Sequence, residues 1–308
     1  MVSRLPPRLR SGDRVRLVSP ASRPDPAQVE RGVSILSDWG LQVEIAAHAF
    51  GFWGHYLAGR DEDRLEDLNE AFRDPGVRAV FATTGGKGSY RIVDRLDFAA
   101  IGRDPKPFVG FSDLTAVHLA RWHRCRLPGF HGPHTAWADD YYGAVAAERL
   151  RMSLMDPHPV VIQQDASEPT AAVTTSGVAT GILMGGTLGV ISSAVGWGCP
   201  RFEGMILLIE AVDQAIGSID RSLTQLIRSG YLDRVAGVAV GQFIRSADPQ
   251  PRKWSMVDVL QDRLSSLGVP ILGGLPIGHG PAPFTVPLGT PARLDAGRRQ
   301  LTIQPAVI

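Results

Sequence analysis

Cysteine is scarce in this sequence: only Cys125 and Cys199 occur among 308 residues, and they lie far apart. A disulfide framework and a structural zinc site both need several cysteines at close spacing, so the sequence predicts neither. So few thiols are typical of a protein from a reducing compartment, and we expect a cytoplasmic location. We also expect no metal ion, because no acidic or cysteine ligand accompanies the histidines at metal-binding spacing.

Long runs of one charge, or of apolar residues, are also missing. The 32 Lys and Arg residues are interspersed with 31 Asp and Glu residues, which gives a formal net charge of +1. No basic run is long enough to follow a nucleic-acid backbone. No segment approaches the roughly 18 apolar residues of a membrane-spanning helix, and residues 1–16 lack the apolar centre of a secretory signal. We therefore expect neither a nucleic acid nor a membrane as partner.

What the first half of the chain does have is a regular alternation of strand and helix patterns. Strand-like runs occur at residues 14–20, 41–46, 77–83 and 108–111. Helical patterns occur at residues 26–40, 61–72, 90–96 and 143–155. This alternation predicts an α/β fold with a parallel sheet, in which ligands bind at the carboxyl ends of the strands.

The pattern changes after residue 155. Residues 156–177 are rich in Pro, Ser, Thr and Asp and surround one short apolar stretch, as in a linker around a strand. Strand-like runs follow at residues 181–186, 205–210 and 235–241, with one clear helix at 219–229. We predict two domains, residues 1–165 with the parallel sheet and residues 166–308 with more strand and less helix.

Ser112 stands between a predicted strand and a predicted helix, at a position typical of a nucleophile. There the hydroxyl is raised above the sheet edge, and the next backbone N–H groups, beginning with Asp113, form a helix start that stabilises an oxyanion. The same position is typical of a serine that caps a helix. Leu114 also replaces the second glycine of the G-x-S-x-G motif. The local sequence alone favours the capping interpretation.

The turn Gly85-Gly86-Lys87-Gly88 follows another predicted strand. It lacks the spacing of a P-loop and of G-x-G-x-x-G, so we expect no nucleotide cofactor. The alternative is that an amide of this turn, from Gly86, donates to the same oxyanion as the amide of Asp113. This requires the strand before the turn to neighbour the strand before Ser112.

Two further residues have the chemistry to assist a serine. Glu210 ends a strongly apolar run, so its carboxylate needs a buried partner. Arg221 or Arg245 would serve, and so would a histidine. His279 lies in the irregular segment Gly278-His279-Gly280-Pro281, where a histidine is a candidate general base or an ordinary loop residue. His131 and His134 are rival histidines, either substrate contacts or turn residues.

These residues belong to a set of motifs that resembles the LD-carboxypeptidases of serine peptidase family S66, the muramoyltetrapeptide carboxypeptidases, which are related to microcin C immunity peptidases. The matching segments run in the same order through nearly the whole chain. They include Val18–Ser22, Tyr56–Gly59, Asp67–Asn69, Gly85-Gly86-x-Gly88, Val109–Asp113, His131–Pro133, Gly185-Gly186, Leu208–Glu210, Ile219–Arg221, Gly278–Gly280 and Pro287–Gly289.

The resemblance implies a Rossmann-like N-terminal domain, a β-rich C-terminal domain and a homodimer. It also implies a catalytic triad of Ser112, Glu210 and His279, with the backbone amides of Gly86 and Asp113 as oxyanion donors. No cofactor is implied.

The substrate implied is a small peptide, a murein tetrapeptide that loses its terminal D-alanine. Lys87, His131 and Arg221 are candidate contacts for its carboxylate. The turn 84–88 departs from the Arg-Gly-Gly-Tyr-Gly of many carboxypeptidases, which leaves the substrate open. The alternatives are a self-immunity peptidase that cleaves a peptidyl-nucleotide antibiotic, with Trp137, Tyr141 and Tyr142 stacking on the base, and a binding protein without catalysis.

Overall fold

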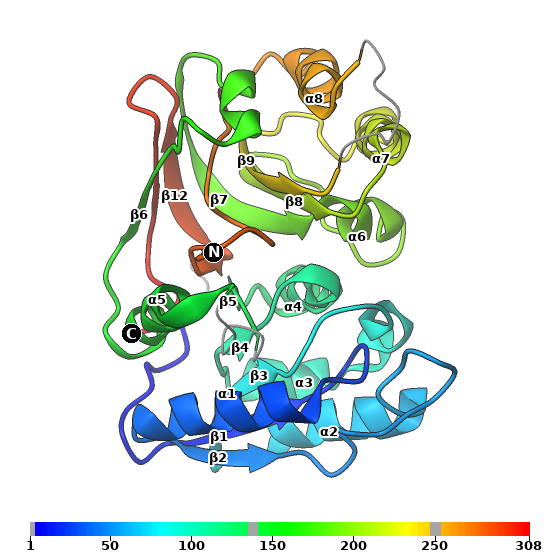
Figure 1. Ribbon diagram of the computed structural model, residues 1–308, viewed down its shortest axis with the longest axis vertical. Helices are drawn as coiled ribbons and strands as arrows, with labels where there is room; N and C mark the ends of the chain where they lie inside the picture. The colour runs from blue at the N-terminus through cyan, green and yellow to red at the C-terminus, as the bar shows by residue number, and fades with distance from the viewer. Residues whose placement is uncertain (1–3, 135–140, 247–253) are drawn as a thin grey trace.

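The protein consists of two lobes stacked along its long axis, each built around one β-sheet (Figure 1). This arrangement is taken from a computed structural model that describes residues 4–134, 141–246 and 254–308. Helices and strands are interleaved in both lobes, so the predicted α/β class is confirmed. Within the described ranges, no helix combines the length and apolar character needed to cross a membrane.

The first sheet is the predicted parallel sheet. Its strands are β1 (Arg14–Val18), β2 (Gln42–Ile45), β3 (Val77–Ala82), β4 (Phe108–Val109), β5 (Gly129–His131) and β11 (Val286–Leu288). Their order is β11-β5-β4-β3-β1-β2, and only β11 runs antiparallel to its neighbour. The helices of this lobe are α1 (Pro26–Asp38), α2 (Asp61–Arg73), α3 (Phe98–Arg103), α4 (Thr115–Cys125) and α5 (Gly143–Met155).

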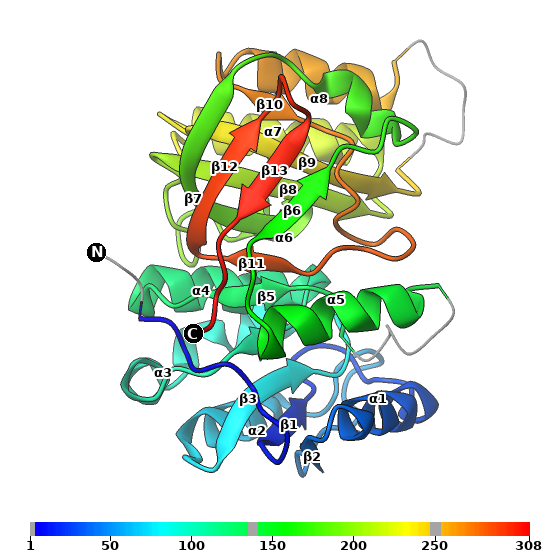
Figure 2. The same ribbon diagram turned by 90° about the vertical axis from the view of Figure 1, so that its left-hand side faces the viewer.

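The second sheet is mixed. Its strands are β6 (Val160–Gln163), β7 (Val178–Thr187), β8 (Met205–Val212), β9 (Gly237–Ile244), β10 (Ile271–Leu272), β12 (Thr290–Asp295) and β13 (Gln300–Ile303). The strand order is β10-β9-β8-β7-β12-β13-β6. Neighbours among the first four strands pair in parallel, and each neighbouring pair from β7 to β6 is antiparallel. Figure 2 shows β6, β12 and β13 side by side. The helices are α6 (Leu188–Ser193), α7 (Ile216–Arg228) and α8 (Met256–Ser265).

The chain crosses between the two lobes more than once. Strand β6, before residue 165, pairs with β13 in the second sheet. Strand β11, after residue 166, pairs with β5 in the first sheet, with Val286 opposite His131. The end of the chain also returns to its beginning, where the Ile308 amide donates to the Pro6 carbonyl at 3.1 Å. The boundary between residues 165 and 166 stays a prediction, and both lobes receive strands from across it.

Most elements follow from local sequence. Helix α1 begins with Pro26 after Asp25, whose carboxylate accepts the Ala27 amide, and such a start is a strong N-terminal signal. Strand β8 is buried along nearly its whole length, as its apolar run predicts.

Four helical segments differ from the sequence patterns. Residues 90–96 form two 3₁₀ turns, Ser89–Arg91 and Val93–Arg95, because the backbone of Ile92 (φ −123°, ψ −12°) leaves the helical region between them. Helices α3, α6 and α8 are not predicted, and α3 and α6 have only six residues each, too few to show a period.

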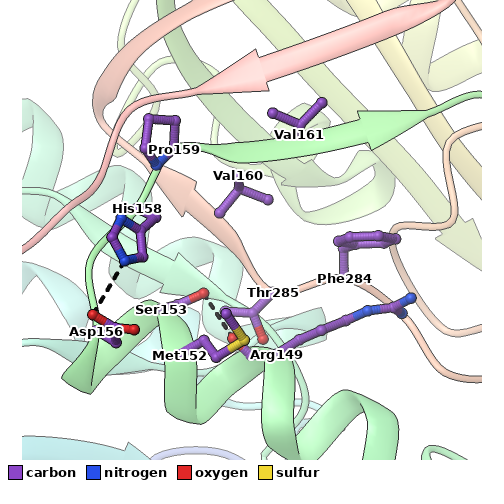
Figure 3. A pocket seen from close by; sticks show the side chains of 10 residues that line it. All are labelled: Arg149, Met152, Ser153, Asp156, His158, Pro159, Val160, Val161, Phe284 and Thr285. Atoms are coloured by element: carbon purple, nitrogen blue, oxygen red, sulfur yellow. Dashed lines mark hydrogen bonds and ion pairs between the residues drawn. The ribbon is translucent and has the colours of Figure 1, made fainter.

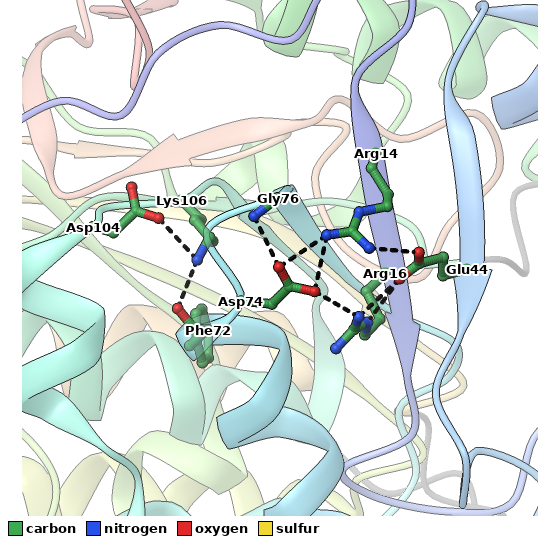
Figure 4. A network of polar contacts seen from close by, with 8 residues as sticks. All are labelled: Arg14, Arg16, Glu44, Phe72, Asp74, Gly76, Asp104 and Lys106. Carbon is green, nitrogen blue, oxygen red and sulfur yellow. Dashed lines mark hydrogen bonds and ion pairs between the residues drawn. The ribbon is translucent and has the colours of Figure 1, made fainter.

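A network of charged side chains secures the first sheet at the end opposite the candidate site (Figure 4). Arg14, the first residue of β1, contacts Glu44 at 2.9 Å and Asp74 at 2.8 Å. Arg16 contacts the same two carboxylates at 2.8 and 2.9 Å. These side chains are partly exposed, so each ion pair contributes little stability, about 0–1 kcal/mol. Their shared geometry ties β1, β2 and the end of α2 together.

A buried histidine lies directly behind the turn that carries Ser112. The Nε2 atom of His118, on α4, is 2.8 Å from the Gly110 carbonyl oxygen. Burial lowers the pKa of this imidazole to about 3, although the Gly110 carbonyl opposes the shift. The folded protein therefore keeps His118 neutral at pH values where the unfolded chain, with a pKa near 6.5, binds a proton. Stability consequently declines as the pH falls below that value.

We expect His118 to account for about 2 kcal/mol of the loss in unfolding free energy between pH 7 and pH 5. The variant His118→Gln keeps an N–H group for Gly110 but does not titrate, so its loss over this range should be smaller by that amount. Urea unfolding at both pH values measures the difference, with His123→Gln, exposed on the same helix, as control. Equal pH dependence in wild type and His118→Gln would contradict this account.

Candidate active site

Ser112 lies in a strained turn between β4 and α4. Its φ angle is +60°, a left-handed conformation that residues with a side chain rarely adopt. It is the first residue of a short 3₁₀ turn, Ser112–Leu114, and the N-cap positions of this turn and of α4 are occupied by Phe111 and Leu114. The capping interpretation is therefore wrong, and the backbone has the geometry of a nucleophile turn.

The glycine turn 85–88 lies against Ser112. The strands before the two segments are parallel neighbours, as the oxyanion interpretation requires. A Cβ atom added to Gly85 would lie only 2.8 Å from the Ser112 Cβ. Two bonds of 2.7 Å lock the segments together, because the Ser89 amide donates to the Asp113 carboxylate and the Ser89 hydroxyl to the Asp113 carbonyl. The backbone amides of Gly86 and Asp113 donate a hydrogen bond to none of the described residues, so both are available to an oxyanion.

Glu210 and His279 form a buried hydrogen-bonded pair. The Nδ1 atom of His279 is 2.7 Å from Oε2 of Glu210, whose side chain is fully buried. The partner of Glu210 is therefore a histidine, and Arg245 instead pairs with Asp213. Burial raises the pKa of the Glu210 carboxyl, but the charge and hydrogen bond of His279 outweigh it and leave this pKa below its usual value.

The loop that carries His279 is held close to Glu210 by glycine and by Gln242. Gly278 has a φ angle of +124°, and a Cβ added there would lie 2.7 Å from the Glu210 carboxylate. The backbone amide of Gly280 donates to Oε1 of the Gln242 side chain, and the backbone amide of Gln242 donates to the Ile277 carbonyl, both at 2.9 Å. Glycine at position 278 is thus needed for the imidazole to reach the carboxylate.

Phe111 brings the two halves of the site together. Its ring centroid lies 4.6 Å from that of His279, and it also packs against His131 and His134. Since Phe111 directly precedes Ser112, His279 lies beside the strained turn. The described residues contain no hydrogen bond between the Ser112 hydroxyl and His279, so this last step of the triad stays a prediction.

The three candidate substrate contacts have different surroundings. Lys87 is exposed on the glycine turn, where its amide donates to the Ser22 hydroxyl at 3.1 Å. His131 is buried, and burial lowers the pKa of its imidazole to about 4, so it is neutral near pH 7. Arg221 is exposed on α7 and contacts neither Glu210 nor another described carboxylate. Of the three, only Lys87 is exposed beside the turn that carries Ser112.

The aromatic residues considered for base stacking are only partly described. Tyr142 packs edge-on against Phe111 with ring centroids 6.0 Å apart, and Tyr141 packs against Tyr142. Trp137 lies outside the described residues. The contact with Phe111 places Tyr142 in the same aromatic cluster as His279.

Threonines that sequence reasoning missed contact the carboxylate side of the site. The Thr187 hydroxyl donates to Oε1 of Glu210, and the Thr187 amide donates to the Thr115 hydroxyl at 3.1 Å. A polar residue that ends an apolar strand directly after Gly185-Gly186 is a weak signal for Thr187. Nothing in the sequence identifies its partner, 72 residues away.

A separate, mostly apolar cavity of about 150 Å³ lies beside residues 284–285 (Figure 3). It is bounded by α5, β6 and residues 284–285, and none of the proposed catalytic residues lines it. Arg149 stacks on the Phe284 ring at 3.7 Å and donates to the Ala282 carbonyl. These contacts anchor the loop between His279 and β11 to the first lobe. Across the described ranges, no three His, Cys, Asp or Glu side chains gather as metal ligands.

Comparison with known proteins gives consistent matches over the whole chain. Sequence profiles of the LD-carboxypeptidase N-terminal and C-terminal domains match residues 15–132 and 180–294. A probable murein peptide carboxypeptidase of Bacillus subtilis is 35% identical, covering 98% of this chain and 95% of the relative. A murein tetrapeptide carboxypeptidase of Pseudomonas aeruginosa is 30% identical, covering 92% and 94%. The solved structure of an MccF-like protein of Bacillus anthracis shares the fold, with a TM-score of 0.86, 24% identity and coverage of 98% and 100%.

The close contact between Gly85 and Ser112 can be tested by an experiment that needs no substrate. The variant Gly85→Ala should push the serine side chain aside and slow its labelling by a fluorophosphonate about 10-fold or more. Gly102→Ala, on α3 with nothing within 4 Å of the added Cβ, should label at the wild-type rate. The labelling rate is measured from time courses by mass spectrometry of the intact protein. The comparison uses variants whose melting temperatures equal that of the wild type. A wild-type rate for Gly85→Ala would mean that Ser112 is not the reactive serine.

Proposed function

The chain belongs to the LD-carboxypeptidase family, peptidase family S66, and we propose that it is a serine carboxypeptidase that releases the terminal D-alanine from a murein tetrapeptide. The observation that supports this most is the buried Glu210–His279 pair beside the strained Ser112 turn. A nucleophile, a base and an orienting carboxylate in this arrangement are the elements of acyl-enzyme hydrolysis.

In the first half of the proposed reaction, the Ser112 hydroxyl attacks the carbonyl carbon on the L side of the scissile bond. Nε2 of His279 takes the hydroxyl proton as the new C–O bond forms. The amides of Gly86 and Asp113 stabilise the oxyanion, each donor contributing about 3–4 kcal/mol in comparable enzymes. The C–N bond then breaks, and His279 returns the proton to the amine of the leaving D-alanine.

In the second half, water replaces the leaving group. His279 takes a proton from water, the hydroxide attacks the acyl carbon, and Ser112 leaves with the proton from His279. Throughout, Glu210 remains ionised and accepts the Nδ1–H of the imidazole, which fixes its tautomer and stabilises the imidazolium. Its lowered pKa keeps the carboxyl ionised across the neutral range.

The choice of a murein peptide as substrate rests on two relatives that carry murein peptide carboxypeptidase in their names and are 35% and 30% identical to this chain. A peptidyl-nucleotide substrate has its support in more distant proteins, a microcin C7 self-immunity protein of Escherichia coli at 24% identity and structures of MccF with sulfamoyl nucleoside ligands at 22–23% identity. The exposed Lys87, on the glycine turn beside Ser112, is proposed to bind the terminal carboxylate of D-alanine. We also propose a cytoplasmic homodimer with its active site between two domains, as the family resemblance implies.

The decisive test of this function is the Ser112→Ala variant. It should retain the wild-type melting temperature and release no D-alanine from murein tetrapeptide, because removal of a catalytic serine in such triads lowers kcat by about 10⁶-fold. Free D-alanine is measured by coupled oxidation or mass spectrometry. Ser193→Ala, exposed on α6, is the matched control and should keep full activity. Release of D-alanine by Ser112→Ala at the wild-type rate would refute the proposal.

A further inference from the structure

Both oxygens of the buried Glu210 carboxylate are used in the folded protein. Oε2 binds Nδ1 of His279 at 2.7 Å, and Oε1 accepts the hydroxyl of Thr187. Thr187 is the last residue of β7 and lies directly opposite Glu210 in the parallel pairing of β7 with β8. Strand register therefore places this hydroxyl beside the carboxylate, and the second oxygen is held independently of the histidine.

The backbone of Thr187 reaches across to the other lobe. Its amide donates at 3.1 Å to the hydroxyl of Thr115, the first residue of α4 and the third after Ser112. The approach is close, because a Cβ added to Gly186 would lie 2.5 Å from the Thr115 hydroxyl oxygen. Thr187 thus links the two lobes, with its backbone amide bound to Thr115 and its hydroxyl bound to Glu210, which in turn binds His279.

We propose that Thr115 and Thr187 are positioning residues, which hold the Glu210 carboxylate so that Oε2 faces His279 and fix it relative to the turn that carries Ser112. The proposal rests on the proposed function. Neither threonine needs to touch the substrate. The Thr187 hydroxyl has a single proton, and donating it to Oε1 stabilises the ionised carboxylate in a site where water is excluded.

Other groups near the carboxylate do not replace this link. His131, on β5, is buried and neutral, and neither of its ring nitrogens bonds to a described residue. Asp213, which follows β8, is occupied by Arg245. Without the Thr187 hydroxyl, His279 would be the one hydrogen-bond donor left to Glu210 among the described residues. One hydrogen bond instead of two would then orient the carboxylate.

The test compares Thr187→Val, which removes the hydroxyl at nearly constant volume, with Thr187→Ser, which keeps it. For Thr187→Val we expect kcat on murein tetrapeptide to fall about 10- to 100-fold, as for a lost hydrogen bond to a charged group, with KM unchanged within twofold. The acid limb of its pH profile should move to higher pH, because the Glu210 carboxyl loses a hydrogen bond that lowers its pKa and must stay ionised for the reaction. Thr187→Ser should restore both kcat and the pH profile.

Two further variants complete the experiment. Thr115→Val, which removes the acceptor of the Thr187 amide, should lower kcat in the same direction, also with KM unchanged. Thr224→Val is the matched control, because its hydroxyl likewise contacts a carboxylate, that of Asp220, on the surface helix α7. It should retain full activity.

The outcomes separate this inference from the proposed function. If Thr187→Val keeps its kcat within twofold while Ser112→Ala is inactive, the positioning role is wrong and the function stands. A loss that Thr187→Ser does not rescue, or one that raises KM and lowers the melting temperature together, also overturns the role in favour of a purely structural one. If Ser112→Ala is active, the function itself fails.

Discussion

The hydrogen bond between Nδ1 of His279 and Oε2 of Glu210 is the interaction on which the rest of the site depends. A carboxylate inside a fully buried strand is unfavourable unless it is paired, so Glu210 requires a partner that arrives from elsewhere in the chain. That partner sits on a loop 69 residues later, and the loop reaches it only because Gly278 leaves room for the carboxylate. Pairing of one buried charge therefore fixes the position of the imidazole.

Each sheet carries part of the proposed active site. The first sheet presents Ser112 and the glycine turn at the carboxyl ends of adjacent parallel strands, where α/β proteins place their ligands. The second sheet holds Glu210 next to Thr187 by strand register. The lobes are joined where the chain passes from the His279 loop into β11, which completes the first sheet beside His131. Because β11 and Arg149 anchor this loop, His279 is held by both lobes.

Much of this arrangement could be predicted from sequence, because local periodicity and burial determine it. The alternation of strands and helices predicted the first sheet, and the apolar run before Glu210 predicted that its carboxylate needs a partner. Local sequence could not choose between histidine and arginine, since that choice depends on which distant loop packs against the strand. It also favoured a capping role for Ser112, which the left-handed backbone contradicts. Long-range packing determines the hydrogen bonds made by Thr115, Thr187 and Ser89, and no local pattern indicates them. The same holds for the exchange of β6 and β11 between the lobes.

In the proposed mechanism, Ser112, His279 and Glu210 act as one relay assembled from both lobes. A crystal structure of the protein after reaction with a peptidyl phosphonate tests it most directly. We expect a bond from phosphorus to the Ser112 oxygen, one phosphonyl oxygen between the amides of Gly86 and Asp113, and Nε2 of His279 within hydrogen-bond distance of the adduct. A phosphonate attached to another residue, or an adduct on Ser112 that neither His279 nor these amides contact, would contradict it.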